Sequence, residues 1–321
     1  MTKNEKKFAV IRPPTEVKYK KFCRNIYRRC HRQFIIVKNE NVFIDIHLLM
    51  KILIDNLEKF KNKSYVRHVK YTKMDFINGI IDIINNNTYW RRYKGPIDKP
   101  DGSYLNKKHN QYCKVGLYEY LYYIIVNIYF EKSKYAKLKH QSIDTTFIRN
   151  LYGTELIQRN TQNKSKNGIK VSTINDVNGV VTSLAIGKGA MNDSKIAIEQ
   201  LKFSFVETNT KQVKNNKKYS QNMYADSQYD SEELYKILRG KGYRPITDVN
   251  IRNTKNETKL KELNKRKRKY LKVASKRSSI ERSYGWLHKY PKLDRCVEKK
   301  LNSYIGLLLL GLSITTSRKI T

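Results

Sequence analysis

Two runs of β-forming residues joined by an Asn-Gly turn constrain the fold of this chain more than any other feature. Ile169 to Asp176 and Val180 to Ile186 are rich in Val, Ile and Thr, and Val177-Asn178-Gly179 separates them. Such a pattern is typical of an antiparallel hairpin, because Asn and Gly readily adopt the left-handed conformations that a tight turn needs. The sequence therefore predicts a sheet built around residues 169–186.

Further strand and helix patterns surround this hairpin in a mixed order. We expect strands at 221–225 and 243–248 and one that enters Asp144, helices at about 192–203, 231–239, 257–290 and 301–317, and a polar, basic loop at 207–220. Asp230 and Glu233 are spaced as a capping box for the second of these helices. Pro291 is expected to break the long basic helix. The order predicts an α/β fold, with a central mixed sheet flanked by helices.

The residues before about 137 follow a helical pattern instead. Apolar positions near 3.6-residue spacing predict helices at 42–60 and 73–86, and two more at about 104–113 and 116–131. The first 38 residues are strongly basic and are interrupted by Pro13-Pro14, which predicts a basic arm. Trp90 is expected to lie in the core. This half of the chain is therefore predicted to be a mainly helical, basic domain.

Charge narrows the choice of partner. The chain holds 66 Lys and Arg against 28 Asp and Glu, a formal net charge of +38. So many like charges repel one another in a compact fold, so the excess is best explained by a polyanionic partner. Nucleic acid is the first choice, because basic groups that neutralise its phosphates release bound counterions. The longest apolar stretch, 304–312, is too short to span a membrane, and four scattered cysteines fit a reducing, intracellular setting. Charge alone does not separate an enzyme from a passive binder.

Three acidic residues stand out by their positions. Asp144 lies on the first strand of the mixed region, Asp226 at the end of a later strand, and Glu281 inside a basic helix. Oxygen ligands suit hard cations such as Mg²⁺, and two ions about 4 Å apart can activate an attacking oxygen and stabilise a leaving one. The alternative for each Asp is a turn residue, and for Glu281 a solvated ion-pair partner. Capping or turn roles are expected for Asp176, Asp193 and Asp230.

Four ordered segments extend this pattern. They are Ser142–Thr146, the hairpin from Gly168 to Ser194, Ala225–Ser231 followed by Gly242-Tyr243-Arg244-Pro245, and Arg277 followed by Ile280–Leu287. Together they resemble the DDE transposases of bacterial insertion sequences, in the branch related to eukaryotic Harbinger elements. The resemblance covers about residues 138–315, and Arg277 and Glu281 keep the family's spacing of four.

The resemblance implies a ribonuclease-H-like DDE catalytic domain at 138–321, preceded by a putative DNA-binding domain at 1–137. It implies that Asp144, Asp226 and Glu281 are catalytic and hold Mg²⁺ or Mn²⁺, with two ions in the site. The implied reactions are cleavage of element ends and strand transfer into target DNA. The implied partners are double-stranded DNA, at terminal inverted repeats and target, and a second copy of the chain. Such a protein would be intracellular and associated with DNA.

Basic residues near the implied site are predicted to contact DNA. They are Arg277, Arg282, His288 and Lys289 around the glutamate, and Lys265, Arg266, Lys267 and Arg268 in the basic helix. The chain departs from the family at three positions: Ala274 replaces a usual Tyr, His288 a usual Lys, and Gln228 a usual Gly. These departures motivate one alternative, a domesticated or decayed relative that only binds DNA. A structure-specific nuclease on the same fold is the other.

Overall fold

The computed structural model describes residues 8–12, 17–38, 41–60, 70–132, 138–206, 221–249, 251 and 256–320, so the predicted loop at 207–220 lies outside it. The chain forms two compact units. Residues 1–11, 135–149 and 156–285 form one, called here the sheet unit, and residues 12–134, 150–155 and 286–321 form the helical unit. The C-terminal residues thus group with the N-terminal helices. The predicted domains 1–137 and 138–321 remain a prediction about independent folding.

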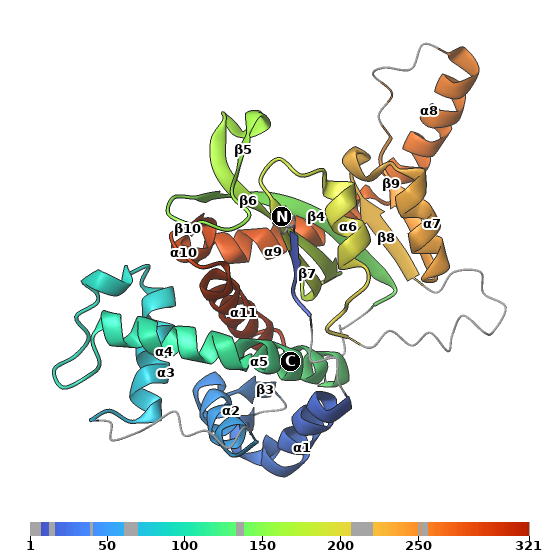
Figure 1. The fold of residues 1–321 in the computed structure, drawn as a ribbon. Coiled ribbons are helices and arrows are strands. Elements are labelled where there is room, and N and C mark those ends of the chain that lie inside the picture. Colours follow the sequence, from blue (N-terminus) through green and yellow to red (C-terminus); the bar gives the residue numbers. More distant parts are fainter. Residues whose placement is uncertain are drawn as a thin grey trace. The chain divides into compact units, whose positions relative to one another are not determined.

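A mixed sheet forms the centre of the sheet unit (Figure 1). Its strands are β1 (Phe8–Val10), β4 (His140–Asn150), β5 (Gln158–Asn160), β6 (Lys166–Asp176), β7 (Val181–Lys188), β8 (Gln221–Ala225) and β9 (Tyr243–Thr247). The order is β1-β7-β6-β4-β8-β9, with β5 paired to β6. The pairs β1–β7, β6–β7, β5–β6 and β4–β6 are antiparallel, whereas β4–β8 and β8–β9 are parallel. This confirms the predicted fold class, a mixed sheet flanked by helices.

The hairpin that anchored the sequence analysis is the β6–β7 pair. Gly179 adopts a φ of 74°, a left-handed conformation that glycine adopts without steric cost. The Asp176 carboxylate accepts hydrogen bonds from the backbone N–H groups of Asn178 (2.9 Å) and Val180 (2.8 Å). Asp176 therefore holds the turn, as its predicted structural role requires.

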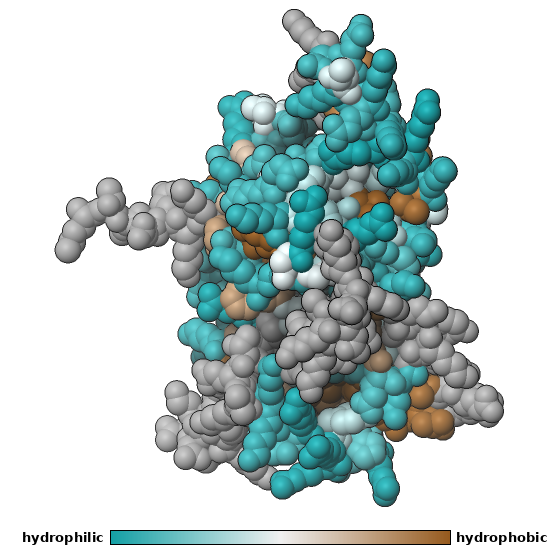
Figure 2. All heavy atoms as spheres, turned by 90° about the vertical axis from the view of Figure 1, so that its right-hand side faces the viewer, coloured by the Kyte–Doolittle hydropathy of each residue, from teal (hydrophilic) through white to brown (hydrophobic). Residues whose placement is uncertain are grey.

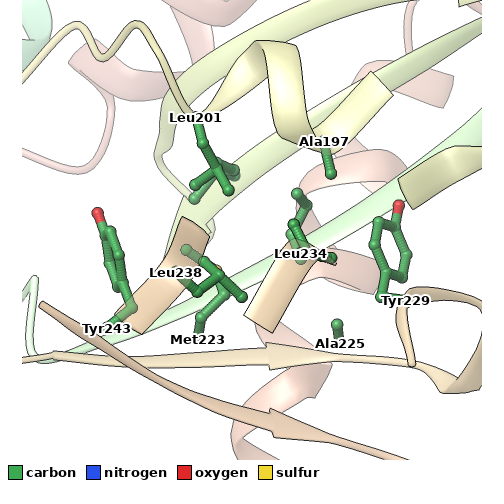
Figure 3. Packing of buried hydrophobic residues seen from close by; sticks show 10 residues of the cluster. Ala197, Leu201, Met223, Ala225, Tyr229, Leu234, Leu238 and Tyr243 are labelled. Atoms are coloured by element: carbon green, nitrogen blue, oxygen red, sulfur yellow. The ribbon is translucent and has the colours of Figure 1, made fainter. Parts of the chain in front are cut away.

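One face of the sheet is apolar and lies beneath α6 (Asp193–Gln200) and α7 (Glu232–Gly240). Its buried cluster, most of which is labelled in Figure 3, consists of Ile143, Ile174, Ala197, Leu201, Met223, Ala225, Tyr229, Leu234, Leu238 and Tyr243. Because side chains alternate along a strand, the neighbours of Ile143 on β4 point to the opposite face. Those neighbours are Ser142 and Asp144.

One local prediction in this unit is wrong. Ser231 is the N-cap of α7 and makes no side-chain cap, so Asp230 and Glu233 form no capping box. Asp230 instead accepts hydrogen bonds from both Tyr235 and Arg266. The long basic helix is divided into α8 (Glu257–Leu271), a 3₁₀ turn at Ala274–Arg277 and α9 (Ser278–His288). Pro291 begins the short helix α10 (Pro291–Asp294), where its missing N–H costs nothing.

The helical unit contains a small hairpin and several helices. They are β2 (Ile35–Lys38), β3 (Asn41–Ile44), α1 (Val17–Phe34), α2 (Ile46–Phe60), α3 (Lys73–Asn85), the 3₁₀ turn η1 (Trp90–Arg92), α4 (Gly102–Val115), α5 (Leu117–Lys132), α10, β10 (Arg295–Cys296) and α11 (Leu301–Ser317). The apolar α11 packs against α4 and α5, and almost all its residues are buried. Within the described residues, no helix is long and apolar enough to cross a membrane.

The predicted basic arm is the main error about the N-terminus. Much of it is helix α1, and Phe8–Val10 form β1, which pairs with β7 in the sheet unit. Residues 41–44 form β3, so the helix predicted from residue 42 begins only at Ile46. The strands β1 and β3 are both short, and pairing with β7 and β2 stabilises them more than their own composition does. Trp90 is 8% exposed, which confirms its predicted place in the core.

Candidate active site

The parallel pairing of β4 with β8 brings Asp144 and Asp226 together. Ser142 stands opposite Tyr224 in this pairing. Asp144 lies two residues further along β4, and Asp226 follows the last residue of β8 by one, so the two residues lie at the same level on neighbouring strands. Between β6 on one side and β8 on the other, β4 is the point where the sheet changes from antiparallel to parallel.

The polar face of the sheet lies against the turn Ala274–Arg277 and α9. Asp144 stands opposite Thr173, and Ser142 opposite Asn175. The Tyr284 hydroxyl on α9 donates to the backbone carbonyl of Asp144 at 2.7 Å, and Thr173 donates to that hydroxyl at 3.1 Å. These buried hydrogen bonds fix α9 directly against the strand that carries Asp144.

Each of the two carboxylates has one oxygen bonded to backbone and one aimed at a shared cation. Oδ1 of Asp144 accepts from Thr145 N, and Oδ1 of Asp226 accepts from Gln228 N, each at 2.8 Å. The Arg277 Nη2 lies 2.8 Å from Asp144 Oδ2 and 3.7 Å from Asp226 Oδ2. One guanidinium therefore occupies the place where the charges of both acids converge.

The environment of Asp144 opposes its ionisation. Burial raises the pKa of Asp144 to about 6, and the nearby charge of Asp226 acts in the same direction. The Arg277 guanidinium and the Thr145 N–H lower it, because both stabilise the carboxylate. A second positive charge at this place would favour the ionised form further.

Glu281 is not brought together with the two aspartates. It lies in the first turn of α9 and is exposed, while its neighbour Ile280 is fully buried. In the part of the chain that the structure describes, no three His, Cys, Asp or Glu side chains are grouped to hold a metal ion.

The residues that follow Glu281 in α9 have different surroundings. The Arg282 side chain is exposed and donates from Nη2 to the carbonyl of Val177 in the hairpin turn, at 2.9 Å. His288 lies in the helical unit, with Nδ1 2.5 Å from Oδ1 of Asp294. Lys289 is exposed. Their predicted contacts with DNA remain predictions.

Helix α8 presents a cationic surface. Lys265, Arg268 and Lys269 line an open hollow of about 560 Å³ on it, and hydrophilic side chains cover most of the described surface on the side of α7 and α8 (Figure 2). Arg266 differs, since its Nη2 lies 3.0 Å from Asp230 Oδ1 and 3.1 Å from the Tyr235 hydroxyl. To contact DNA as predicted, the Arg266 guanidinium would have to give up its hydrogen bonds to Asp230 and Tyr235.

Two residues near the site, Tyr270 and Lys170, escaped the sequence analysis. Tyr270 hydrogen-bonds Arg277, four residues before Ala274, where the family usually has Tyr. Lys170 on β6 pairs with Asp193 at 2.7 Å, and both side chains are nearly buried. The sequence signal for Tyr270 was that a tyrosine lies one helical turn before the position at which the family usually has one. The Lys170–Asp193 pair gave no signal, because residues 23 apart in sequence meet only through the sheet.

Comparison with known proteins identifies the family. Residues 135–315 match the transposase DDE domain, so the chain belongs to this family of transposases. The comparison with curated proteins found no match. Among solved structures, the chain is similar to the piggyBac transposase in its synaptic complex with hairpin DNA, with a TM-score of 0.43 and 13% identity over 97% of this chain and 77% of that one. The assignment to the family therefore rests on the match of residues 135–315.

Proposed function

We propose that the protein is an active DNA transposase that uses Asp144, Asp226 and Glu281 for metal-dependent cleavage of element ends and for strand transfer into target DNA. The observation that carries the proposal is the convergence of Asp144 Oδ2 and Asp226 Oδ2 on one cationic position. The family match supports a transposase, and the four sequence segments support the finer placement among insertion-sequence enzymes related to Harbinger elements.

The donor set fits a hard divalent cation. Both aspartates offer a carboxylate oxygen whose partner oxygen is already fixed by a backbone N–H, and Mg²⁺ and Mn²⁺ prefer oxygen ligands. When bound, such ions would polarise the scissile phosphodiester and raise the acidity of the attacking hydroxyl or water. Asp144 and Asp226 would hold them, and the proposal gives Glu281 the third place.

Arg277 has two roles in this account. Its guanidinium lies near both aspartates and neutralises them, which stabilises two like charges close together. Its predicted role as a DNA contact follows once another cation takes this position, because guanidinium groups bind phosphate oxygens as readily as carboxylates. Glu281 follows Arg277 by four residues, which is about one helical turn. When Arg277 leaves the aspartates, the carboxylate of Glu281 is therefore near enough in the sequence to become the third ligand of the proposed site.

The basic surfaces supply the DNA contacts of the proposal. Lys265 and Arg268 on α8 are exposed to solvent, and phosphate neutralisation by such groups releases counterions. Double-stranded DNA at the terminal inverted repeats and target is the proposed partner. Because two element ends must be held at once, the active form is proposed to be a homodimer or larger assembly, acting on DNA inside the cell.

A cleavage assay tests the proposal. Purified protein is incubated with DNA that carries the inverted repeats flanking its own coding sequence, with Mg²⁺, Mn²⁺ or EDTA. We expect metal-dependent nicking and joining that Asp144→Asn, Asp226→Asn and Glu281→Gln abolish. Glu232→Gln is the matched control, since Glu232 is an exposed helical glutamate of the same unit, with its side chain 85% exposed.

The alternatives give different outcomes. Sequence-specific binding without any cleavage would indicate a decayed relative that only binds DNA. Cutting of hairpins or junctions without joining would indicate a structure-specific nuclease. Full activity of Glu281→Gln alongside inactive aspartate variants would remove Glu281 from the site and leave the aspartate pair in place.

A further inference from the structure

The helical unit contains an open pocket of about 870 Å³ that the catalytic proposal does not use. Its wall is formed by the turn at 89–92, by Asn106 and Asn110 on α4, by Tyr152, and by residues 297–300 with Ser303. Every one of these residues belongs to the helical unit. The volume lies within the range of about 300–1,000 Å³ that is typical of pockets for small organic ligands.

The rim of the pocket is cationic. Arg91, Arg92, Lys299 and Lys300 line it and are exposed, and none of the ion pairs among the described residues involves them. Glu298 is the one acid among the described lining residues. Four unneutralised cations around one hollow favour an anionic ligand.

The Glu298 carboxylate is buried and already satisfied. Its Oε1 accepts from Trp90 Nε1 at 2.8 Å and from Lys292 Nζ at 3.2 Å, and its Oε2 accepts from Ser303 Oγ at 2.7 Å. Trp90, Glu298 and Ser303 are the buried residues of the lining and are called here the floor of the pocket. Lys292 is itself buried, so the opposite charges of Lys292 and Glu298 neutralise each other. The acid therefore does not offset the four cations of the rim.

The floor is rigid before any ligand binds. The indole of Trp90 stacks on His109, with ring centroids 5.2 Å apart and an interplanar angle of 28°. His109 is fully buried and is held by the Tyr118 hydroxyl at 2.7 Å and the Ser303 carbonyl at 3.0 Å. A preformed floor lowers the ordering cost of binding.

Two aromatic rings stand beside the cations and are exposed. Tyr89 is 46% exposed and Tyr152 is 58% exposed, and both line the pocket. The guanidinium of Arg92 lies 5.6 Å from the Tyr89 ring centroid. The turn that carries Tyr152 is fixed by Asn150, whose Oδ1 accepts from the N–H of Tyr152 and of Gly153. Exposed rings interleaved with cations are the chemistry that binds the bases and phosphates of an unpaired strand.

We propose that this pocket binds an unpaired stretch of a DNA strand, with bases against Tyr89 and Tyr152 and phosphates on Arg91, Arg92, Lys299 and Lys300. A duplex hides the faces of its bases by stacking, so it would reach the cations of the rim but not the rings. An inorganic anion would use the cations alone. This inference goes beyond the proposed function and concerns binding in the helical unit, without any step of catalysis.

Fluorescence anisotropy with a labelled oligothymidylate of about ten nucleotides tests the proposal, with the full chain in EDTA so that no cleavage contributes. We expect Tyr152→Ala to weaken binding roughly five- to 150-fold, which is the stacking contribution of about 1–3 kcal/mol for one ring converted to affinity, and Tyr152→Phe to bind as the unaltered protein does. The double variant Lys299→Ala/Lys300→Ala should lower the salt dependence of binding by about 1.4 in the logarithmic slope, at about 0.7 for each lost contact.

The matched control is Lys107→Ala/Lys114→Ala, which removes two exposed charges of the same unit outside the pocket. Circular dichroism of each variant confirms folding. Wild-type affinity in both pocket variants would overturn the proposal. So would equal weakening by the control pair, or a duplex of the same length whose binding depends on Tyr152 as strongly as that of the single strand. Because the assay holds no metal, failure of the catalytic proposal leaves its outcome unchanged.

Discussion

Replacing Arg277 should make the DNA-free protein bind Mg²⁺ more tightly, although Arg277 adjoins the proposed site. Its guanidinium lies 2.8 Å from Asp144 Oδ2 and 3.7 Å from Asp226 Oδ2. An incoming metal ion must displace this internal cation from both carboxylates. Arg277→Gln removes the competitor and keeps a side chain of similar reach.

The magnitude follows from the geometry. At an effective dielectric constant of about 20, each pair attracts by roughly 4–6 kcal/mol before desolvation is counted. The net contribution of a hydrogen bond between charged groups is smaller, about 1.5–3 kcal/mol. Since 1.4 kcal/mol is a factor of ten in affinity, Arg277→Gln should tighten Mg²⁺ binding roughly ten- to a hundredfold.

Isothermal titration calorimetry with Mg²⁺ and Mn²⁺ measures this effect. The titration is run at pH 8, above the pKa of about 6 that burial gives Asp144, so that its carboxylate is ionised in the unaltered protein. Arg282→Gln is the control, because Arg282 donates to the Val177 carbonyl and not to either aspartate. Equal or weaker metal binding by Arg277→Gln, relative to the unaltered protein, would refute the competition argument.

Three further outcomes follow from the structure. Burial holds the pKa of His109 below its usual value. The unfolded chain therefore takes up this proton first, so the melting temperature should fall as the pH drops below about 6.5, and it should fall less in His109→Gln over the same range. A Cβ on Gly102 would lie 1.6 Å from a backbone carbonyl oxygen, so Gly102→Ala should cost at least about 3 kcal/mol in denaturant unfolding, whereas Gly240→Ala, with nothing within 4 Å, should cost none. Lys265→Ala/Arg268→Ala should reduce the salt slope of duplex binding by about 1.8 and leave duplex affinity at low salt weakened, which filter binding across a salt series measures.

The parts of the fold that local pattern determines were predictable. The Asn-Gly hairpin, the strand 221–225 and the apolar helix 301–317 all agree with the structure. Alternation along β4 also placed Asp144 opposite the apolar cluster, because a strand buried on one face must present its other residues to the far side. The adjacency of Asp144 and Asp226, in contrast, depends on the parallel pairing of β4 with β8, which no local pattern in the sequence indicates.

The parts of the fold that depend on contacts between residues distant in sequence were not predictable. Strand β1 lies in a basic segment and exists through its pairing with β7. Asp230 looked like a cap, but Arg266 and Tyr235 take its carboxylate across 36 and 5 residues of sequence. The pairing of Arg277 with Asp144 and Asp226 gave no local signal either, and its DNA contact stays a prediction. In each case the structure depends on a long-range electrostatic or backbone contact.

The central claim is that Asp144 and Asp226 together hold the divalent cation. Anomalous diffraction from crystals of the protein soaked in Mn²⁺ tests it most directly, because manganese scatters anomalously and light atoms do so only weakly. The account predicts a peak at bonding distance from both carboxylates, with the Arg277 guanidinium moved away from them. Manganese bound elsewhere, with the guanidinium still bridging the two aspartates at saturating metal, would contradict it.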